Sequence, residues 1–296
     1  MQILNYGSLN YDYVFDVDHI VKLGETVQAT TAQVFLGGKG LNQSVAMARA
    51  GSKVFHAGIV GADGQKLLEL CDAEGIDRRF VSTVDDRTGN AIIQVNKNKN
   101  NAILVSAGAN GQNTAEKMEE VFSHFQEGDY LLLQNEVNGL PQLIEYGRTK
   151  KMKIVLNPSP FNENILACDL RDVSCLIMNE TEGRALSGKK YLMDIIGEIR
   201  EKYPKVACVL THGETGSAYF DTSCIMHFDA YRVDTCDTTA AGDTFTGYFL
   251  ACLCKGLDKK EAVRYASAAA AIAASRRGAV PSIPALAEVE SFLKNK

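Results

Sequence analysis

Short apolar runs alternate with helix-like segments along the second half of the chain. The runs cover residues 130–133, 153–156, 175–178 and 206–210. Each run is apolar at successive positions, which is typical of strands covered on both faces. Helix-like segments separate or follow them at residues 139–150, 181–186, 191–202, 242–256 and 258–276. Strands that alternate with helices predict an α/β fold with a central, mostly parallel sheet and helices on both faces.

Polar, turn-capable residues follow these runs at the point where each predicted strand ends. The polar segments are residues 134–136, 157–159, 179–181 and 211–213, and residues 7–10 likewise follow the first apolar run, 3–6. The carboxyl edge of an open α/β sheet is where ligands bind. The repetition of this pattern at five strands therefore predicts a binding site along that edge.

Two other segments alternate with a period of two. Tyr11, Tyr13, Phe15 and Val17 fall on one face of residues 11–18, and residues 90–96 alternate more weakly. This pattern is typical of antiparallel strands with one solvated face. We expect a single domain over residues 1–296, with a small antiparallel β lid built from inserted segments at about 11–36 and 89–106.

Composition and charge exclude several classes of protein. The chain has 296 residues, 46% of them hydrophobic and 23% charged, which does not fit a disordered, collagen-like or coiled-coil protein. A formal net charge of −5 gives no bulk attraction to nucleic acid or to an anionic membrane. No apolar stretch reaches the roughly 18 residues of a membrane span, and the start has no basic segment typical of a signal peptide. The eight scattered cysteines form no CxxC and are typical of buried thiols in a reducing compartment, so we expect a cytoplasmic protein.

The segment with the clearest chemistry is residues 237–245, DTTAAGDTF. Small residues lead there into an apolar helix that carries Asp243 in its first turn. Backbone N–H groups at a helix start lack intrahelical partners and favour an anion, and small side chains let a phosphate come close. The alternative is a packed turn in which Asp243 only complements the helix dipole. The local pattern leaves both interpretations open.

A glycine-rich segment, residues 35–43, precedes a predicted helix at 41–50. It does not match the phosphate-loop pattern GxxxxGK[ST], because Leu41 follows Gly40. It also fails GxGxxG, because Gln43 takes the last position. Alone, the segment indicates only that backbone comes close to something there.

Taken together, these segments resemble a known family. GSLNYD (7–12), GGKGLNQ (37–43), QNE (134–136), NPSP (157–160), NETE (179–182), THGETG (211–216), DTTAAGDTF (237–245) and SRRGAVPSIP (275–284) occur in that order. The series resembles the ribokinase family of carbohydrate kinases over essentially the whole chain. The resemblance implies an ATP-dependent kinase that phosphorylates the primary hydroxyl of D-ribose to give ribose 5-phosphate.

The resemblance also implies roles for individual residues. Asp243 would be the general base, and the backbone N–H groups of Ala240, Ala241 and Gly242 would face the transferring phosphoryl group. The sugar would be bound by Asp243 together with Asn10, Asp12, Gly38, Lys39, Gly40, Asn42 and Glu136. ATP would lie against Asn179, Glu182, Thr211, Gly213, Gly216, Gly242 and Ser267, with Glu182 ordering Mg²⁺ through water. A potassium ion would be held by Asp237, Thr239, Ala273, Arg276, Gly278 and Ser282.

Several features depart from the family pattern or leave alternatives open. Ser267 stands where a His or Asn is common. Residues 61–66, GADGQK, depart from the glycine pattern that family members commonly show after GxD, so that turn is expected to differ. Tyr11 and Tyr13 are expected to narrow the sugar pocket, which keeps a sister kinase for another sugar or a nucleoside open. A non-catalytic sugar-binding regulator is a second alternative, and the missing GxGxxG disfavours an NAD-dependent dehydrogenase. The resemblance also implies a homodimer that pairs through the lids.

Overall fold

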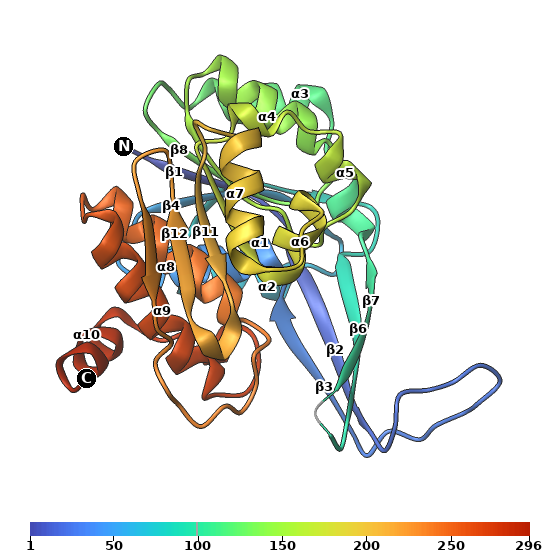
Figure 1. Ribbon diagram of the computed structural model, residues 1–296. Helices are drawn as coiled ribbons and strands as arrows, with labels where there is room; N and C mark the ends of the chain where they lie inside the picture. Colours follow the sequence, from blue (N-terminus) through green and yellow to red (C-terminus); the bar gives the residue numbers. More distant parts are fainter. Residues whose placement is uncertain (99) are drawn as a thin grey trace.

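The computed structural model describes residues 1–98 and 100–296 and contains two β-sheets (Figure 1). The larger sheet has nine strands in the order β13-β12-β11-β10-β9-β8-β1-β4-β5. Their bounds are β1 Ile3–Tyr6, β4 Val54–Gly61, β5 Asp77–Val84, β8 Tyr130–Gln134, β9 Lys153–Asn157, β10 Cys175–Asn179, β11 Ala207–Thr211, β12 Ser217–Phe220 and β13 Ile225–Phe228. Neighbouring strands from β5 to β11 pair in parallel, whereas β12 and β13 pair antiparallel at one edge. The predicted mostly parallel sheet is confirmed.

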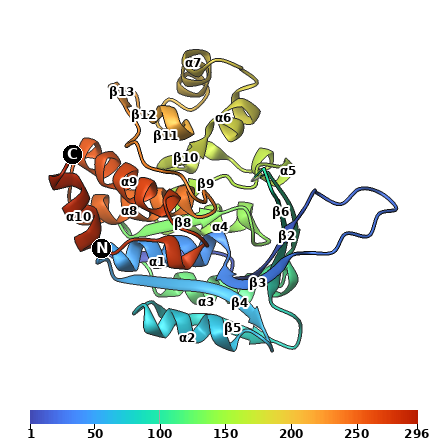
Figure 2. The ribbon, with the colours of Figure 1, turned by 90° about the horizontal axis from the view of Figure 1, so that it is seen from below.

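Helices cover both faces of this sheet. One face carries α1 Lys39–Arg49, α2 Gln65–Ala73, α8 Ala241–Cys254, α9 Lys259–Ala274 and α10 Leu286–Lys294. The other carries α3 Ala115–Ser123, α4 Leu140–Thr149, α5 Glu163–Leu166, α6 Glu180–Ser187 and α7 Leu192–Lys202. Short 3₁₀ turns occur at Gly108–Gly111, Leu170–Asp172, Gly213–Thr215 and Val280–Ser282. Figure 2 shows the same arrangement from below.

The central strands are apolar at successive positions because both of their faces are covered. In β10, Leu176 and Met178 pack into the core beneath α3–α7, whereas Cys175 and Ile177 pack into the core beneath α1, α8 and α9. All four of these residues are buried. The unbroken apolar pattern that predicted these strands therefore arises because each strand contributes side chains to two separate hydrophobic cores.

The smaller sheet has the order β3-β2-β6-β7, with β2 Asn10–Val17, β3 Thr31–Gly37, β6 Gly89–Asn96 and β7 Asn101–Ser106. In Figure 1 it extends away from the larger sheet. The expected antiparallel pairing holds for β2–β3 and β6–β7, whereas β2 and β6 run parallel. They run parallel because each enters the sheet from the main domain at the same end, Asn10 beside Gly89.

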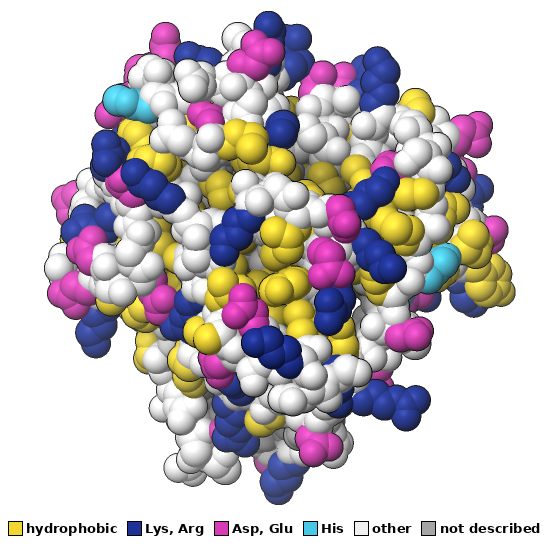
Figure 3. All heavy atoms as spheres, turned by 90° about the vertical axis from the view of Figure 1, so that its left-hand side faces the viewer, with side chains coloured by type: hydrophobic (Ala, Val, Ile, Leu, Met, Phe, Trp, Pro, Cys, Tyr) yellow, Lys and Arg dark blue, Asp and Glu magenta, His cyan; other side chains and the backbone are white. Residues whose placement is uncertain are grey.

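The surface and the cysteines agree with the composition. Acidic and basic side chains are interspersed over the face beside α9 and α10 that Figure 3 shows. All eight cysteines are free thiols. Within the described residues, no helix is both long and apolar enough to cross a membrane.

Candidate active site

Asp243 lies in the first turn of α8 and is only 5% exposed. Both of its carboxylate oxygens accept a hydrogen bond from α1. Asn42 Nδ2 donates to Oδ2 at 3.0 Å, and Gln43 Nε2 donates to Oδ1 at 2.9 Å. A carboxylate held in this way by two neutral amides keeps one fixed orientation in a nearly dry site.

The backbone in front of Asp243 presents free N–H groups. Those of Ala240 and Gly242 make no hydrogen bond to residues 1–98 or 100–296, as expected for the start of a helix. The N–H of Ala241 differs, because it donates to the carbonyl oxygen of Thr238 at 3.2 Å. Two of the three predicted anion donors are therefore available, and the tight turn before α8 occupies the third.

The residues predicted to bind a sugar converge on the start of α1. Glu136, just after β8, accepts hydrogen bonds through Oε2 from Ser8 Oγ at 2.5 Å and from the backbone N–H of Lys39 at 2.9 Å. The backbone N–H of Gly40 donates to Ser8 Oγ at 3.2 Å. Gly38 caps the helix at a φ of 92°, a conformation that favours glycine. These bonds join the ends of β1 and β8 to α1.

Asn10 and Asp12 complete this group from β2. Asn10 is buried, and its Oδ1 accepts a hydrogen bond from Asn110 Nδ2 at 2.7 Å. The Asp12 carboxylate lies against Gly37, where a Cβ atom would collide with it. The β2–β3 pairing thus brings Asp12 over the glycine-rich segment that precedes α1.

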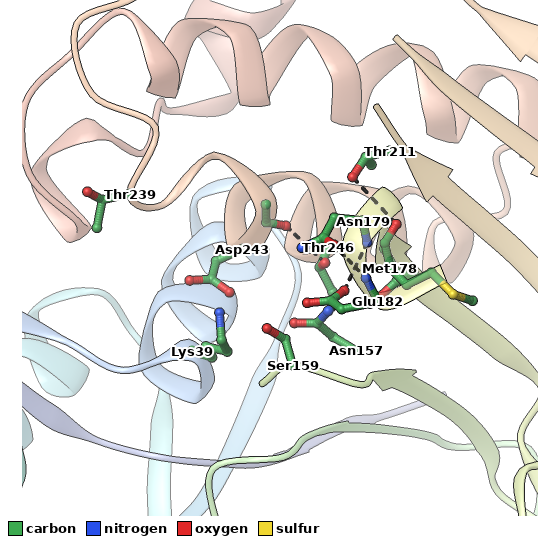
Figure 4. Close-up of a pocket in the computed structure, with 12 residues that line it drawn as sticks. Lys39, Asn157, Ser159, Met178, Asn179, Glu182, Thr211, Thr239, Asp243 and Thr246 are labelled. Carbon is green, nitrogen blue, oxygen red and sulfur yellow. Dashed lines mark hydrogen bonds between the residues drawn. The ribbon is translucent and has the colours of Figure 1, made fainter. Parts of the chain in front are cut away.

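Charge is concentrated around Lys39. Burial alone would lower the pKa of its ammonium, but Asp243, Glu136, Glu182 and Asp12 surround it and raise that pKa overall. Burial, followed by the charges of Glu136 and Asp243, raises the pKa of Asp12 to about 7. Several carboxylates sharing one cation are typical of a site built for proton transfer or for a polar ligand. Figure 4 shows Asp243 and Lys39 pointing toward one another.

A cavity of about 80 Å³ adjoins Asp243 on the side of β9–β11 (Figure 4). It is lined by Lys39, Asn157, Ser159, Ile177, Met178, Asn179, Glu182, Thr211, Thr239, Gly242, Asp243 and Thr246. Asn179 and Glu182 form a capping box at the start of α6, in which each side chain accepts the other's backbone N–H at 2.9 Å. This motif holds the buried Glu182 carboxylate in the same cavity as Asp243.

The other residues predicted for the nucleotide lie beyond this cavity. Gly213 and Gly216 belong to the turn after β11, and a Cβ at Gly216 would collide with the carbonyl of Phe228. Ser267, on α9, lines a separate hollow with Phe228, Ala230 and Tyr231. The structure therefore places Asn179, Glu182 and Thr211 with Asp243, and it places Ser267 apart from them.

The residues predicted for potassium fall into two groups. Asp237 accepts hydrogen bonds from the backbone N–H groups of Thr239 and Gly278, both at 3.0 Å, which ties two loops together. Ala273, Arg276 and Ser282 do not line the cavity beside Asp237. Ala273 accepts a hydrogen bond from Arg276 N at 3.0 Å, and Ser282 Oγ donates to the carbonyl of Ala279 at 2.7 Å.

The donor chemistry fits both predicted ions. Mg²⁺ usually keeps several waters and takes one or two carboxylates plus substrate phosphates, which suits the buried Glu182, one of two carboxylates that line this polar cavity. Within the described residues, no three His, Cys, Asp or Glu side chains gather as an all-protein metal cluster. Around Asp237, its carboxylate and the carbonyls of Thr239 and Gly278 are oxygen ligands of the kind a monovalent cation takes, but Arg277 lines this cavity too and Ala273, Arg276 and Ser282 do not.

Sequence reasoning missed several residues of the site. Ser8, Gln43, Asn157, Ser159 and Thr246 all contact or line it. All but Thr246 lie inside segments that carried the family resemblance, so their position in those segments was the available signal. What the pattern lacked was the partner of each side chain, which lies at least 91 residues away for the bonds that Ser8 and Gln43 make to Glu136, Gln134, Asn157 and Asp243.

The expectation that Tyr11 and Tyr13 narrow the sugar pocket is wrong. They alternate with Asp12 along β2 and so lie on the opposite face of the smaller sheet. Tyr11 is buried and donates its hydroxyl hydrogen to the carbonyl of Asp63 at 2.8 Å, and Tyr13 is exposed. The inner face instead presents Phe35, Ile93 and Val95 to the cavity that Asp12 and Asp237 both line.

Comparison with known proteins defines the class. The model of the pfkB family of carbohydrate kinases matches residues 2–286, and the chain belongs to that family. Its relatives include the ribokinase of Haemophilus influenzae, 34% identical over 305 residues that cover 98% of this chain and 97% of the relative. The deoxyribokinase of Salmonella typhi is 29% identical and covers 99% of both chains. The structure of Arabidopsis thaliana ribokinase complexed with ribose and ATP, at 27% identity, superposes with a TM-score of 0.85 over 99% of this chain and 98% of that one. The chain is thus a carbohydrate kinase with the ribokinase-like fold.

Proposed function

We propose that this kinase transfers the terminal phosphoryl group of ATP to the primary hydroxyl of D-ribose and yields ribose 5-phosphate. The observation that carries the proposal is the buried Asp243 carboxylate, fixed beside the free N–H groups of Ala240 and Gly242. Ribose would lie against Asn10, Asp12, Gly38, Lys39, Gly40, Asn42 and Glu136. The similarity to ribokinases, one of them complexed with ribose and ATP, supports this choice of substrates.

The reaction needs a base and a stabiliser of charge. As the primary hydroxyl oxygen attacks the terminal phosphorus, Asp243 accepts its proton, the new O–P bond forms and the bond to the ADP oxygen breaks. The N–H groups of Ala240 and Gly242 bind the equatorial oxygens of the transferring group, where one such donor contributes about 3 kcal/mol. Ala241 contributes a third donor only after its bond to Thr238 opens. Glu182 would hold Mg²⁺ through a water molecule, and the ion would neutralise charge on the phosphates.

The nucleotide would lie along the ends of β10 and β11. Asn179, Glu182 and Thr211 line the cavity beside Asp243, which suits the phosphate end. Gly213, where an added Cβ would meet nothing within 4 Å, would leave room for the ribose and base in the turn after β11. Ser267 lies in the neighbouring hollow with Tyr231, so we place it at the edge of the base rather than near the phosphates.

We place the monovalent cation beside Asp237. Its carboxylate joins the turn before α8 to the loop at Gly278, so an ion held there would fix the backbone donors in front of Asp243. Thr239 and Gly278, which line the same cavity, would add carbonyl oxygens. Turnover in KCl should exceed turnover in an equal concentration of a tetramethylammonium salt, and Asp237→Asn should abolish that difference. Equal rates in both salts would refute the site.

We propose that the smaller sheet is a lid that excludes water from the transfer. Its segments, about 11–36 and 89–106, leave the domain at Gly37, Gly38 and Gly89. At Gly89 a Cβ would collide with the carbonyl of Ala107 and with Asn10 and Asn110, whereas at Gly37 it would displace the Asp12 side chain. Closure would bring Asp12 down onto the sugar and prevent hydrolysis of ATP.

A second candidate substrate is a nucleoside. The cavity beside Asp12 measures about 350 Å³ and has an apolar wall of Phe35, Ile93 and Val95, against which a base would pack. Release of ADP over a panel of ribose, deoxyribose, other pentoses, fructose, adenosine and sugar phosphates separates the candidates. Turnover of a nucleoside without turnover of any free sugar would refute the ribose assignment.

The role of Asp243 has its own test. Asp243→Asn keeps the shape of the side chain but cannot accept the proton, so it should abolish turnover while calorimetry still detects ribose binding. An active Asn variant would remove the proposed base. The substrate panel tests the assignment of ribose, and this variant tests the role of Asp243 as the base. Failure of one proposal can therefore be told from failure of the other.

We also propose that two copies pair through the outer faces of their lids. Tyr13, Val34, Ile92 and Leu104 are exposed and adjacent in register across all four strands of the smaller sheet. Ile92→Glu should give a monomer by light scattering at micromolar concentration. Ile103→Glu, on the inner face, is the matched control and should stay dimeric. A monomeric wild type would refute the pairing.

The free cysteines agree with a reducing, cytoplasmic location.

A further inference from the structure

A chain of fully buried polar side chains leads away from Asp243 into the domain. Gln43, Gln134, Asn5, Ser44 and His56 are each 0% exposed. Burial of uncharged polar groups without partners is costly, so each must find hydrogen bonds inside the protein. The sugar and the nucleotide touch none of these five residues in the proposed function.

The hydrogen bonds of this chain diverge from Gln134, which donates toward Asp243 through Gln43 and, on its other side, to Asn5. Asn5 Oδ1 accepts from Gln134 Nε2 at 3.0 Å, and Gln134 Nε2 also donates to Gln43 Oε1 at 2.7 Å. Gln43 Nε2 then donates to Asp243 Oδ1 at 2.9 Å and to Asn157 Oδ1 at 3.1 Å. A carboxylate can only accept, so Asp243 requires the nitrogen of Gln43 to face it. The oxygen of Gln43 then faces Gln134, and Gln134 must present its nitrogen in turn.

The far end of the chain anchors it to the main sheet. Asn5 Nδ2, on β1, donates to the carbonyl of Gly40 and to Ser44 Oγ, both at 2.7 Å. Ser44 Oγ lies 2.8 Å from Nδ1 of His56 on β4. Burial lowers the pKa of His56 to about 4, so its ring is neutral. The chain therefore ends on neighbouring central strands, which are among the most rigid parts of an α/β domain.

We propose that Gln43 and Gln134 are positioning residues for Asp243. Gln43 holds Oδ1 of the carboxylate, and Gln134 fixes which end of the Gln43 amide faces that oxygen. With Asn42 on Oδ2, the carboxylate plane cannot turn, and it meets the substrate hydroxyl in one orientation. The inference rests on the proposed role of Asp243 as the base and adds how the fold orients its carboxylate.

The test uses two substitutions that remove these bonds in different ways. Gln43→Met keeps an unbranched side chain of similar length but removes both donated bonds. Gln134→Glu keeps the shape two bonds away from Asp243 and, at a pH where its carboxyl is ionised, cannot donate to Gln43 Oε1. Gln43 must then reverse its amide and direct its oxygen at the carboxylate. Asn113→Asp is the matched control, a buried amide that also loses two donated bonds and lies outside this chain of bonds.

A positioning role affects kcat rather than KM, because alignment of the base matters in the transition state. With D-ribose and saturating ATP, we expect Gln43→Met to lower kcat about 10- to 100-fold and Gln134→Glu about tenfold, with KM for ribose changed by less than about threefold. Asn113→Asp should keep kcat within about twofold. Circular dichroism and calorimetric ribose binding show which variants are folded.

Unchanged kcat in a folded Gln43→Met or Gln134→Glu variant would overturn the proposal. So would a rise in KM equal to the fall in kcat, which indicates general damage to the pocket. If Gln43→Met fails to fold, Gln134→Glu still decides, since its volume is preserved. An active Asp243→Asn variant would instead refute the base itself, so the two failures are distinguishable.

Discussion

Gly247 sets how closely α1 and α8 cross, and replacing it with alanine tests the packing that supports the site. A Cβ atom there would lie 2.5 Å from Ala46 Cβ, 2.8 Å from the carbonyl oxygen of Gln43 and 3.1 Å from the Met47 nitrogen. Ordinary van der Waals contact begins at 3.4 Å, so the two helices must separate by about 1 Å. Overpacking of this kind costs about 1–3 kcal/mol.

Gly197 provides the matched control. It also lies inside a helix, α7, but an added Cβ would meet nothing within 4 Å. Alanine is a better helix former than glycine by about 1 kcal/mol, so Gly197→Ala should stabilise the protein by about 0.5–1 kcal/mol. The two substitutions make the same chemical change and should have opposite signs. Unfolding in urea followed by circular dichroism measures both.

Activity should follow the packing at Gly247. Asp243 lies one helical turn before Gly247, and Gln43 one turn before Met47, so separating the helices lengthens the bond between the two side chains. We expect kcat to fall at least about tenfold in Gly247→Ala and to stay unchanged in Gly197→Ala. A Gly247→Ala protein as stable as Gly197→Ala, or one with full kcat, would refute the reasoning.

Three further predictions test the electrostatics and the local motifs. Burial raises the pKa of Asp12 from 3.8 to about 7, so the stability from its proton is complete below about pH 4 and is lost as pH rises through about 7. Asp12→Asn should remove about 2–4 kcal/mol of the loss in unfolding free energy between pH 4 and pH 8, and equal pH profiles would contradict this. Asn179→Ala removes the cap of α6 and should cost about 1 kcal/mol in urea unfolding and raise KM for MgATP; an unchanged KM would argue against the nucleotide site. Arg49→Met leaves Glu74 and the carbonyl of Ile283 unpaired and should cost about 1–3 kcal/mol, whereas Arg78→Met, at an exposed pair, should cost less than about 1 kcal/mol.

The main sheet was predictable because its strands are buried on both faces. β8, β9, β10 and β11 each read as an unbroken apolar run, and the polar residues that follow them meet at one edge. The start of the helix at Asp243 was equally predictable, because small residues followed by an acidic first turn are typical of a helix N-terminus. The family resemblance then assigned roles that spacing alone left open.

The pairing of side chains was not predictable from local pattern. Gln43 meets Gln134 across 91 residues and Asp243 across 200 residues, and nothing in the sequence next to Gln43 indicates either partner. The face of Tyr11 and Tyr13 was misjudged for a related reason. Alternation shows that they share a face of β2, but which face covers the site depends on how the smaller sheet leaves the domain.

The excess of negative charge around Lys39 explains why Asp243 is held by neutral polar side chains. Four carboxylates surround one ammonium there, so a further ionised group behind Asp243 would add repulsion in a nearly dry environment. Amides donate hydrogen bonds to a carboxylate without adding charge, and a neutral His56 ends the series without adding any either. Neutral amide dipoles thus orient the anionic Asp243 from the interior of the domain. Lys39 is then the cation that faces the substrates.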